Sequence, residues 1–351
     1  YSEMMRELGV LAPRSNFIKL IYNGNDFGIM NIEESFSKEL IESEQRKESV
    51  ILSFNEDKIW EWWKFLKNPV ANNIFYTNHK NTFIDVFSSK KIFSKPQLLG
   101  DYKKGVSLLR GYVEGKLKPN QVFDYEITSK FFAMSHILFS SSITKDGLIF
   151  NNMRFYFNPL NGKLEPISYD NHTFNFNDFY DKKMFFIGNH SGWKNHLKYD
   201  SYEAWYQKLF NDPVFLDLLS KEVIKISNTI LYTDKYEDIF KLINEHYVPI
   251  LREEFIDIEK FNVDKFKQRV QFVREYFLKP IHLRDKEIIS LKSIDYKSKK
   301  NILDRQNVLK KMSEVIFAYD ISNENENLIE IMNPLDYKII IDEIYFTLRK
   351  S

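Results

Sequence analysis

Two parts of the chain carry the alternating pattern that is typical of strands joined by tight turns. Phe17–Tyr22 alternates with a period of two, NGND follows it, and Phe27–Ile32 returns. Met153–Asn158 and Lys163–Ser168 form a second pair, joined across Asn161-Gly162. Asn-Gly favours a hairpin because both residues tolerate positive φ. The pattern therefore predicts two β-hairpins.

Most of the remaining chain has apolar residues at helical spacing, apart from a short expected strand at Ser49–Phe54. The expected helices are Ser2–Leu8, Ser35–Glu44, Glu56–Asn68, Gln97–Glu114, Phe123–Phe139, Tyr202–Phe210, Pro213–Leu231, Tyr236–Tyr247 and Val263–Phe277, and residues 301–318 are expected to be helical or mixed. Residues 171–198 are rich in Asn, Asp and Gly without a clear period, which predicts a long irregular loop. Loops of this length in compact domains are often functional.

The order of these elements predicts an α+β fold. We expect an α+β core over residues 1–200 and a mostly helical lobe over residues 201–351. The chain opens at Tyr1, inside an expected helix and without a Met, so we expect a fragment or a processed product of a longer chain.

The composition of the chain excludes several classes of function. The 351 residues are 43% hydrophobic and 28% charged, which is typical of a soluble globular protein. The net charge of +1 gives no general attraction to nucleic acid, and no run of about 18 apolar residues predicts a membrane span. The absence of Cys excludes disulfides and thiolate chemistry.

Nucleotide-binding Gly-rich motifs and the HExxH metalloprotease motif are absent. His172, His190 and His196 lie in or beside the expected irregular loop, where they are either exposed side chains or ligands of a zinc ion.

Asp146, Asn152 and Asp170 offer a different site. Asp146 ends a polar loop, Asn152 opens the second hairpin and Asp170 follows its return strand. Protein kinases use this order: the first Asp meets the substrate hydroxyl, and the Asn and the second Asp hold metal. Here Asp146 and Asn152 are six positions apart, against five in the kinase catalytic loop. The alternative is that these residues only form turns, as Asn and Asp commonly do at strand ends.

The segment RELGVLAPRSNFIKLIYNGNDFGIMNIEESF resembles the spore coat protein H (CotH) kinase family. That family shows an "elG-aPr" segment followed by an "NG---G-Y---E" hairpin. NNMRFYFNPLNGKLEPISYD resembles its second motif, in which an Asn opens a hairpin and an Asp follows the return strand. The resemblance covers about residues 3–175, and the matching positions of the first motif are Gly9, Pro13, Arg14, Asn23, Gly24, Gly28 and Glu34.

The resemblance implies an atypical, protein-kinase-like two-lobe fold that transfers phosphate from ATP to Ser or Thr of a protein substrate. It implies Mg²⁺ or Mn²⁺ held by Asn152 and Asp170, with Asp146 as the catalytic acid of the loop. Glu34 would lie in the nucleotide-side lobe as the partner of a phosphate-contacting Lys; alternatively it is a helix-start Glu favoured by the dipole. Transfer of AMP would use the same metal site, and a bacterial spore coat or cell surface is the implied location.

Arg154, inside the second motif, is a candidate phosphate contact, or else pairs with Glu165 across the hairpin. The family often has WDxD where this chain has YDNH, so His172 replaces a second carboxylate. The family's phosphate-binding Lys is expected upstream of Tyr1. These departures keep a second hypothesis open, namely a non-catalytic structural or surface-assembly protein that retains the fold.

Overall fold

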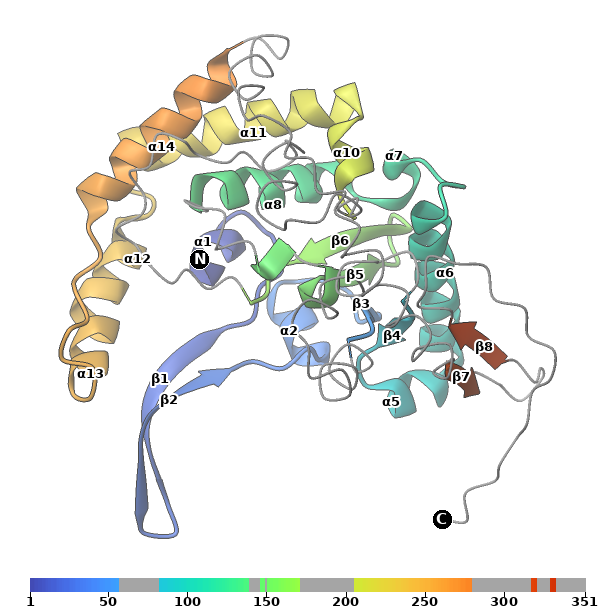
Figure 1. The fold of residues 1–351 in the computed structure, drawn as a ribbon, viewed down its shortest axis with the longest axis horizontal. Coiled ribbons are helices and arrows are strands. Elements are labelled where there is room, and N and C mark those ends of the chain that lie inside the picture. The colour runs from blue at the N-terminus through green and yellow to red at the C-terminus, as the bar shows by residue number, and fades with distance from the viewer. Residues whose placement is uncertain are drawn as a thin grey trace, which may run out of the picture. The chain divides into compact units, whose positions relative to one another are not determined.

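The computed structural model describes residues 1–56, 82–138, 146–148, 150–170, 205–279, 317–320 and 329–332 (Figure 1). The chain divides into two units, Tyr1–Asn55 with Ile84–Ile294 and Glu56–Phe83 with Asp295–Ser351. Strands β7 (Phe317–Asp320) and β8 (Ile329–Met332) pair antiparallel within the second unit. All other elements described below belong to the first unit.

Several expected features lie outside the described residues. They are nearly all of the helix expected at Glu56–Asn68, the irregular loop with its three histidines, the boundary near residue 200 and all but the last two residues of 301–318. Those last two residues belong to strand β7. The division into a core and a helical lobe at residue 200 therefore stays a prediction.

A four-stranded antiparallel sheet forms the centre of the first unit, in the order β4-β3-β5-β6. Its strands are β3 (Ile51–Phe54), β4 (Ile84–Val86), β5 (Arg154–Asn158) and β6 (Lys163–Ile167). The two inner strands, β3 and β5, are buried along almost their whole length. Pro166 lies in β6, an outer strand, where the missing N–H removes no ladder bond from the centre of the sheet. The mixed α+β class expected from the sequence is confirmed.

The β5–β6 hairpin is confirmed, but its turn differs from the expected two-residue connection. Asn158 pairs with Lys163, so four residues form the turn, and among them only Gly162 has positive φ, at 68°. The side chain of Asn158 accepts a hydrogen bond from the backbone N–H of Leu160 at 2.9 Å. The side chain of Asn161 accepts one from Lys163 N–H at 2.9 Å. These local side-chain bonds stabilise the longer turn.

The two faces of the sheet have different coverings. On one face, Ile51, Tyr156 and Ile167 pack with Leu40 and Ile41 of helix α2 (Lys38–Ser43). On the other face, α6 (Pro96–Val113) approaches closely at Gly105, where an added Cβ would lie 2.9 Å from Leu52 Cδ1. Phe155 on this face contacts the ring of Trp205, with centroids 5.2 Å apart. The sheet is therefore enclosed between two apolar layers.

The first hairpin forms a separate two-stranded sheet of β1 (Ser15–Tyr22) and β2 (Asn25–Glu33). Asn23 and Gly24 form its two-residue turn with φ of 50° and 76°, which confirms the predicted turn. Glu254 accepts a hydrogen bond from Ile29 N–H at 2.8 Å. The φ of Gly28 is 75°, which favours glycine, and an added Cβ would lie 2.2 Å from the Glu254 carboxylate oxygen unless that side chain moved.

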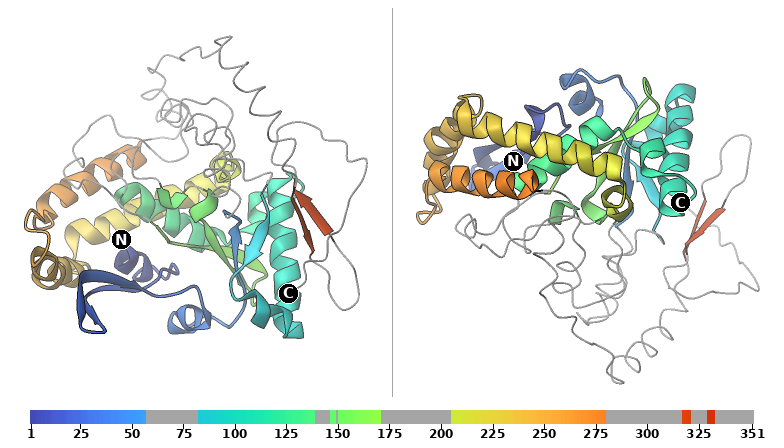
Figure 2. Two further views of the ribbon diagram at one scale, coloured as in Figure 1. Left: turned by 60° about the horizontal axis from the view of Figure 1, so that its bottom comes forward. Right: turned by 90° about the horizontal axis from the view of Figure 1, so that it is seen from above.

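Helices dominate the described chain after residue 205. Figures 1 and 2 show α11 along α8, with α14 beside α11. The remaining described elements of the first unit are α1 (Ser2–Arg6), α5 (Ser89–Phe93), α7 (Pro119–Val122), α8 (Tyr125–Leu138), the 3₁₀ turns η3 (Asp146–Leu148) and η4 (Phe150–Asn152), α10 (Gln207–Phe210), α11 (Pro213–Tyr232), α12 (Glu237–Lys241), the π-helix η6 (Leu242–Tyr247), α13 (Val248–Arg252) and α14 (Val263–Leu278). The helices expected in this region are present.

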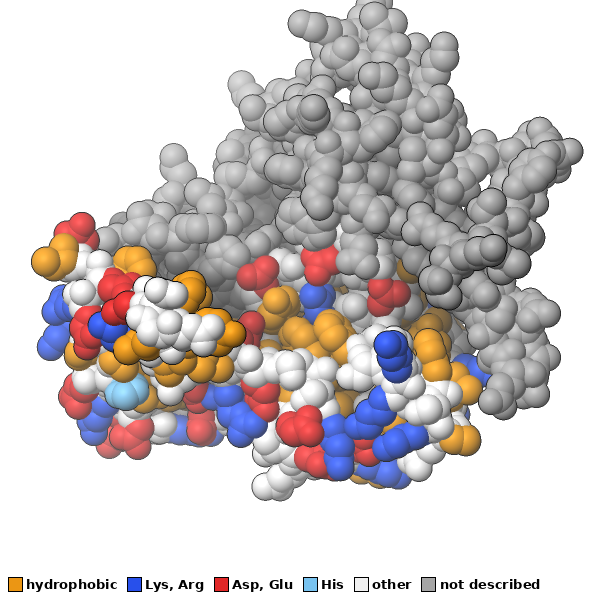
Figure 3. Space-filling model, turned by 90° about the horizontal axis from the view of Figure 1, so that it is seen from below, with side chains coloured by type: hydrophobic (Ala, Val, Ile, Leu, Met, Phe, Trp, Pro, Cys, Tyr) orange, Lys and Arg blue, Asp and Glu red, His pale blue; other side chains and the backbone are white. Residues whose placement is uncertain are grey.

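Charged side chains of both signs are interspersed on the face shown in Figure 3, in keeping with the net charge of +1. Among the described residues, no helix has both the length and the apolar character that crossing a membrane requires.

A buried ion pair ties the sheet to the segment after α2. Glu165 of β6 is only 2% exposed and accepts hydrogen bonds from Arg46 Nε at 3.1 Å and from Asn158 Nδ2 at 2.7 Å. Arg46 also donates to the carbonyl of Gly9 at 2.8 Å. The pair therefore joins three segments that are distant in sequence.

We predict that Arg46→Met lowers the free energy of unfolding by about 3 kcal/mol, because it leaves a buried carboxylate without its cation. Urea unfolding measures the change. Lys221→Ala is the matched control: its pair with Asp217 is exposed, with side chains 69% and 60% accessible, and a loss below about 0.5 kcal/mol is expected. Equal losses from the two variants would contradict the prediction.

Candidate functional site

The pairing of β5 with β6 brings the two expected metal ligands together. Arg154 pairs with Ile167, so the residues just before β5 and just after β6 lie at the same end of the hairpin. Asn152 Nδ2 donates a hydrogen bond to Asp170 Oδ2 at 2.8 Å, across eighteen positions of sequence. Asn151 Nδ2 in turn donates to Asn152 Oδ1 at 3.2 Å. The two side chains that the sequence singled out are thus in direct contact.

Asp170 holds an uncommon backbone conformation. Its φ is 51°, in the left-handed region that costs a residue with a Cβ on the order of 1 kcal/mol and that Asp and Asn tolerate best. The preceding residues are fixed: Ser168 N–H donates to Leu11 O at 2.8 Å, and the Tyr169 ring packs against that of Phe36 with centroids 4.8 Å apart. Left-handed residues held in this way are frequent at functional sites.

Asp146 lies in η3, the turn that precedes η4 and Asn152. The position of η3 is set by Trp205, whose Nε1–H donates to the carbonyl of Leu148 at 3.0 Å. The backbone of Asp146 is therefore part of an anchored turn close in sequence to Asn152, while its side chain lies outside the described set.

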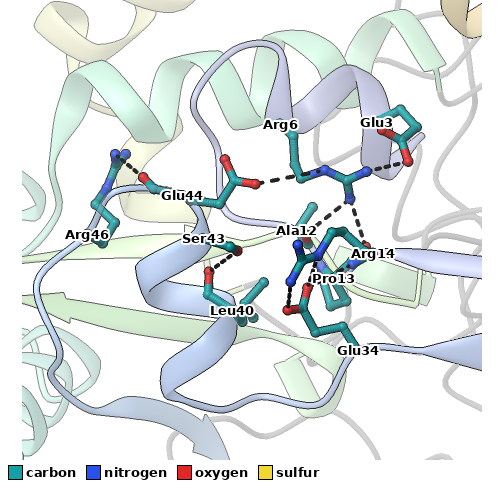
Figure 4. Close-up of polar contacts among 10 residues, drawn as sticks. All are labelled: Glu3, Arg6, Ala12, Pro13, Arg14, Glu34, Leu40, Ser43, Glu44 and Arg46. Carbon is teal, nitrogen blue, oxygen red and sulfur yellow. Dashed lines mark hydrogen bonds and ion pairs between the residues drawn. The ribbon is translucent and has the colours of Figure 1, made fainter.

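The carboxylate of Glu34 is bound by Arg14 (Figure 4). Arg14 Nε donates to Glu34 Oε2 at 3.0 Å, the second guanidinium nitrogen Nη2 contacts Oε1, and Glu34 N–H donates to Arg14 O at 2.8 Å. Nearby, Arg6 donates to the carbonyl of Pro13 at 3.1 Å. These contacts close the base of the first hairpin. They give the Arg14 and Glu34 side chains of the first motif a structural role.

Glu33 is a residue of this region that sequence reasoning missed. Burial raises its pKa, and the Asp170 carboxylate raises it further. For Glu34, burial also acts to raise the pKa, but the hydrogen bonds from Arg14 outweigh it and the pKa is lowered. Successive side chains of a strand point to opposite sides. The carboxyl of Glu33 is therefore affected by the charge of Asp170, whereas that of Glu34 is bound by Arg14. The alternation of the strand predicts that Glu33 and Glu34 lie on opposite sides, but it does not predict which of them lies on the side of Asp170.

Arg154 is 5% exposed, and it lies opposite Ile167 in the sheet. The alternative that it pairs with Glu165 is therefore wrong: Glu165 lies opposite Tyr156 and binds Arg46. Instead, Arg154 Nη1 donates to the carbonyls of Asn151 and Met153, at 2.6 and 3.2 Å.

The Asn152–Asp170 pair matches a hard divalent cation in the type of its donors. Mg²⁺ takes carboxylate and amide oxygens, usually from one or two side chains together with phosphates and water. To hold a cation, Asn152 must turn its oxygen Oδ1 toward Asp170 in place of Nδ2. In the part of the chain that the structure describes, no group of three or more His, Cys, Asp or Glu side chains could hold a metal ion. The pair can supply one or two oxygen ligands of such a cation.

The family model for CotH kinase protein matches residues 1–283. The chain therefore belongs to the CotH kinase family, as the two motifs predicted. The match extends beyond the motifs through α14, so the helices after residue 205 are part of the family unit. A search of curated proteins finds no match. Membership in this family indicates a kinase-like function.

The two adjacent glutamates allow a test of the electrostatics. A carboxyl whose pKa is raised in the folded state destabilises that state above its unfolded pKa, and the effect disappears as the pH falls below that value. We predict that Glu33→Gln raises the free energy of unfolding at pH 7.5, by less than about 1 kcal/mol because the carboxyl is only partly buried and solvent screens its charge. The gain should vanish below about pH 4.

Glu34→Gln is the matched control with the opposite sign. Because the pKa of Glu34 is lowered in the folded state, its contribution is present above the unfolded pKa and is lost as the pH falls through the folded pKa. The variant should be less stable than wild type at pH 7.5 and approach it in acid. Urea unfolding at both pH values measures the two variants, and changes of the same sign would contradict the assignment.

Proposed function

We propose that this protein is a CotH-like kinase that transfers the γ-phosphoryl group of ATP to a Ser or Thr hydroxyl of a protein substrate. The observation that carries the proposal is the direct contact between Asn152 and Asp170, the two side chains that the resemblance to the family implies as metal ligands. They lie at one end of the β5–β6 hairpin, next to the turns that bear Asp146.

Asn152 and Asp170 would hold Mg²⁺ or Mn²⁺, which supplies positive charge to neutralise the phosphate oxygens of ATP. The carboxylate of Asp146 would orient the acceptor hydroxyl and take its proton. A bond then forms between the hydroxyl oxygen and the γ-phosphorus as the bond from that phosphorus to the β-phosphate oxygen breaks, and ADP leaves. Because phosphoryl transfer needs little covalent help, positioning and charge neutralisation supply most of the rate.

The proposal includes a two-lobe arrangement in which the nucleotide binds between a strand-rich N-terminal part and a helical part. Glu34 would belong to the nucleotide side, and Arg154 is a candidate for contact with phosphate. That the substrate is a protein is suggested by the family, and a spore-coat or cell-surface location belongs to the same proposal. Transfer of AMP would use the same pair of ligands and differs in the mass of the product.

A non-catalytic assembly protein is the second candidate, and one sequence feature favours it. His172 stands where the family often has a second carboxylate, and imidazole is a poor ligand for Mg²⁺. In that case the contact between Asn152 and Asp170 would serve only to close the end of the hairpin.

Asp170→Asn separates the two candidates. The variant keeps an acceptor oxygen for Asn152 Nδ2, and Asn tolerates the left-handed backbone, so only the charge is removed. We predict unchanged folding and a loss of phosphotransfer on the order of 10³-fold, because several kcal/mol of charge neutralisation are lost.

The measurement uses ATP labelled at the γ-phosphate, or at the α-phosphate to follow AMP, with Mg²⁺ or Mn²⁺ and a generic protein acceptor such as casein or the protein itself. Mass spectrometry of the product distinguishes phosphate from AMP. Lys221→Ala, remote from the pair in sequence and exposed, is the control for substitution alone. Equal labelling by wild type and Asp170→Asn would refute the metal role, and no nucleotide binding by either would favour the assembly protein.

A further inference from the structure

The guanidinium group of Arg154 lies against three aromatic rings. Its central carbon is 5.5 Å from the ring centre of Phe36, 5.4 Å from that of Phe87 and 5.0 Å from that of Tyr169. We call Phe36, Phe87 and Tyr169 the aromatic cage. The rings come from three separate segments: before α2, directly after β4, and between β6 and Asp170. We infer that Arg154 is a positioning residue that holds Asn152 and Asp170 in place for a metal-bound nucleotide; this inference rests on the proposed function.

The polar end of Arg154 fixes the turn that carries Asn152. Nη1 donates to the carbonyl of Asn151, before Asn152, and to the carbonyl of Met153, after it. Hydrogen bonds from a charged donor are stronger than neutral ones, and these are buried. Asn152 is therefore held on both sides by one guanidinium group.

The same guanidinium group also contacts the segment that carries Asp170. Tyr169 directly precedes Asp170, and its ring has the closest centre to Arg154 of the three rings in the cage. Tyr169 also packs on Phe36, which packs on Phe87 with centroids 4.8 Å apart. Since Asp170 needs a left-handed backbone, restraint of its neighbour helps to keep that conformation.

These two contacts use different properties of arginine. A planar guanidinium can stack on aromatic rings while its N–H groups donate in the plane, whereas the ammonium group of Lys is a compact point charge. Arg154 thus links two segments that are separated by the whole hairpin, and each segment carries one member of the pair. A direct contact with phosphate would use the charge alone and would not need the aromatic cage.

The variants Arg154→Met, Arg154→Lys and Phe87→Leu test this role. Phe87→Leu alters the aromatic cage without removing any polar group. Arg269→Met is the matched control, because Arg269 is 3% exposed, lies 5.6 Å from the ring centre of Phe272 and belongs to α14. The first readout is amide hydrogen exchange of residues 150–153 and 168–170 in protein without added metal or nucleotide.

We expect Arg154→Met to speed exchange in both segments by at least tenfold, with Arg154→Lys and Phe87→Leu intermediate and Arg269→Met unchanged there. The second readout is the concentration at which Mn²⁺ binding to the protein is half-maximal in the presence of ATP. Arg154→Met should raise it about 10–100-fold, the usual effect of removing a group that orients a metal ligand. The KM for ATP at saturating Mn²⁺ should change little.

Unchanged exchange in both segments would overturn the inference. A second result would also overturn it: Arg154→Met raises the KM for ATP, Arg154→Lys restores that KM, and exchange and Mn²⁺ dependence stay as in wild type. That result identifies a direct phosphate contact. The proposed function fails if wild type does not bind Mn²⁺, or if Asp170→Asn binds it equally well. In that case the exchange data still decide whether Arg154 holds the two segments. If Arg154→Met does not fold, Arg154→Lys and Phe87→Leu carry the same comparison.

Discussion

The antiparallel register of β5 with β6 is the constraint on which the candidate site depends. Pairing of Arg154 with Ile167 sets every other pair in the hairpin, and it leaves Asn152 and Asp170 facing each other beyond the last pair. A shift of one residue would move all the side chains of a strand to the opposite face. Tyr156 would then leave the layer of Leu40 and Ile41, and Phe155 would leave its contact with Trp205.

Two further contacts stabilise the β5–β6 hairpin in this register. On one face of the sheet, Arg154 connects the turn before β5 to Tyr169 after β6. On the same face, Arg46 binds the buried Glu165 and links β6 to the segment after α2. Both are charged groups inside an apolar layer, where a group left without its partner costs more than it would at the surface. The end of the hairpin that carries the pair is therefore held by buried charged groups, whereas its exposed turn is held by local bonds and by Asn161 Nδ2, which donates to Asp124 Oδ2 at 2.8 Å.

The first motif has a structural account that is separate from the chemistry. Asn23 and Gly24 form the turn, Gly28 makes room for Glu254, and Arg14 with Glu34 closes the base of the hairpin. Glu34 is thus engaged in a structural ion pair, whereas the pKa of its neighbour Glu33 responds to Asp170. Membership in the CotH kinase family links this hairpin and the β5–β6 hairpin to the helices through α14 in one unit.

The sequence by itself determined the local features: both hairpins, the helices of regular spacing, the α+β class and the Asn152–Asp170 pair. These depend on short-range periodicity and turn chemistry, which neighbouring residues specify. Only the tertiary structure decided that β3 and β4 extend the β5–β6 hairpin while β1–β2 stays a separate sheet. It also decided that Arg154 sits in the aromatic cage, and which of Glu33 and Glu34 responds to Asp170. Such choices depend on contacts between segments far apart in the chain, and no local pattern encodes which distant partner is present.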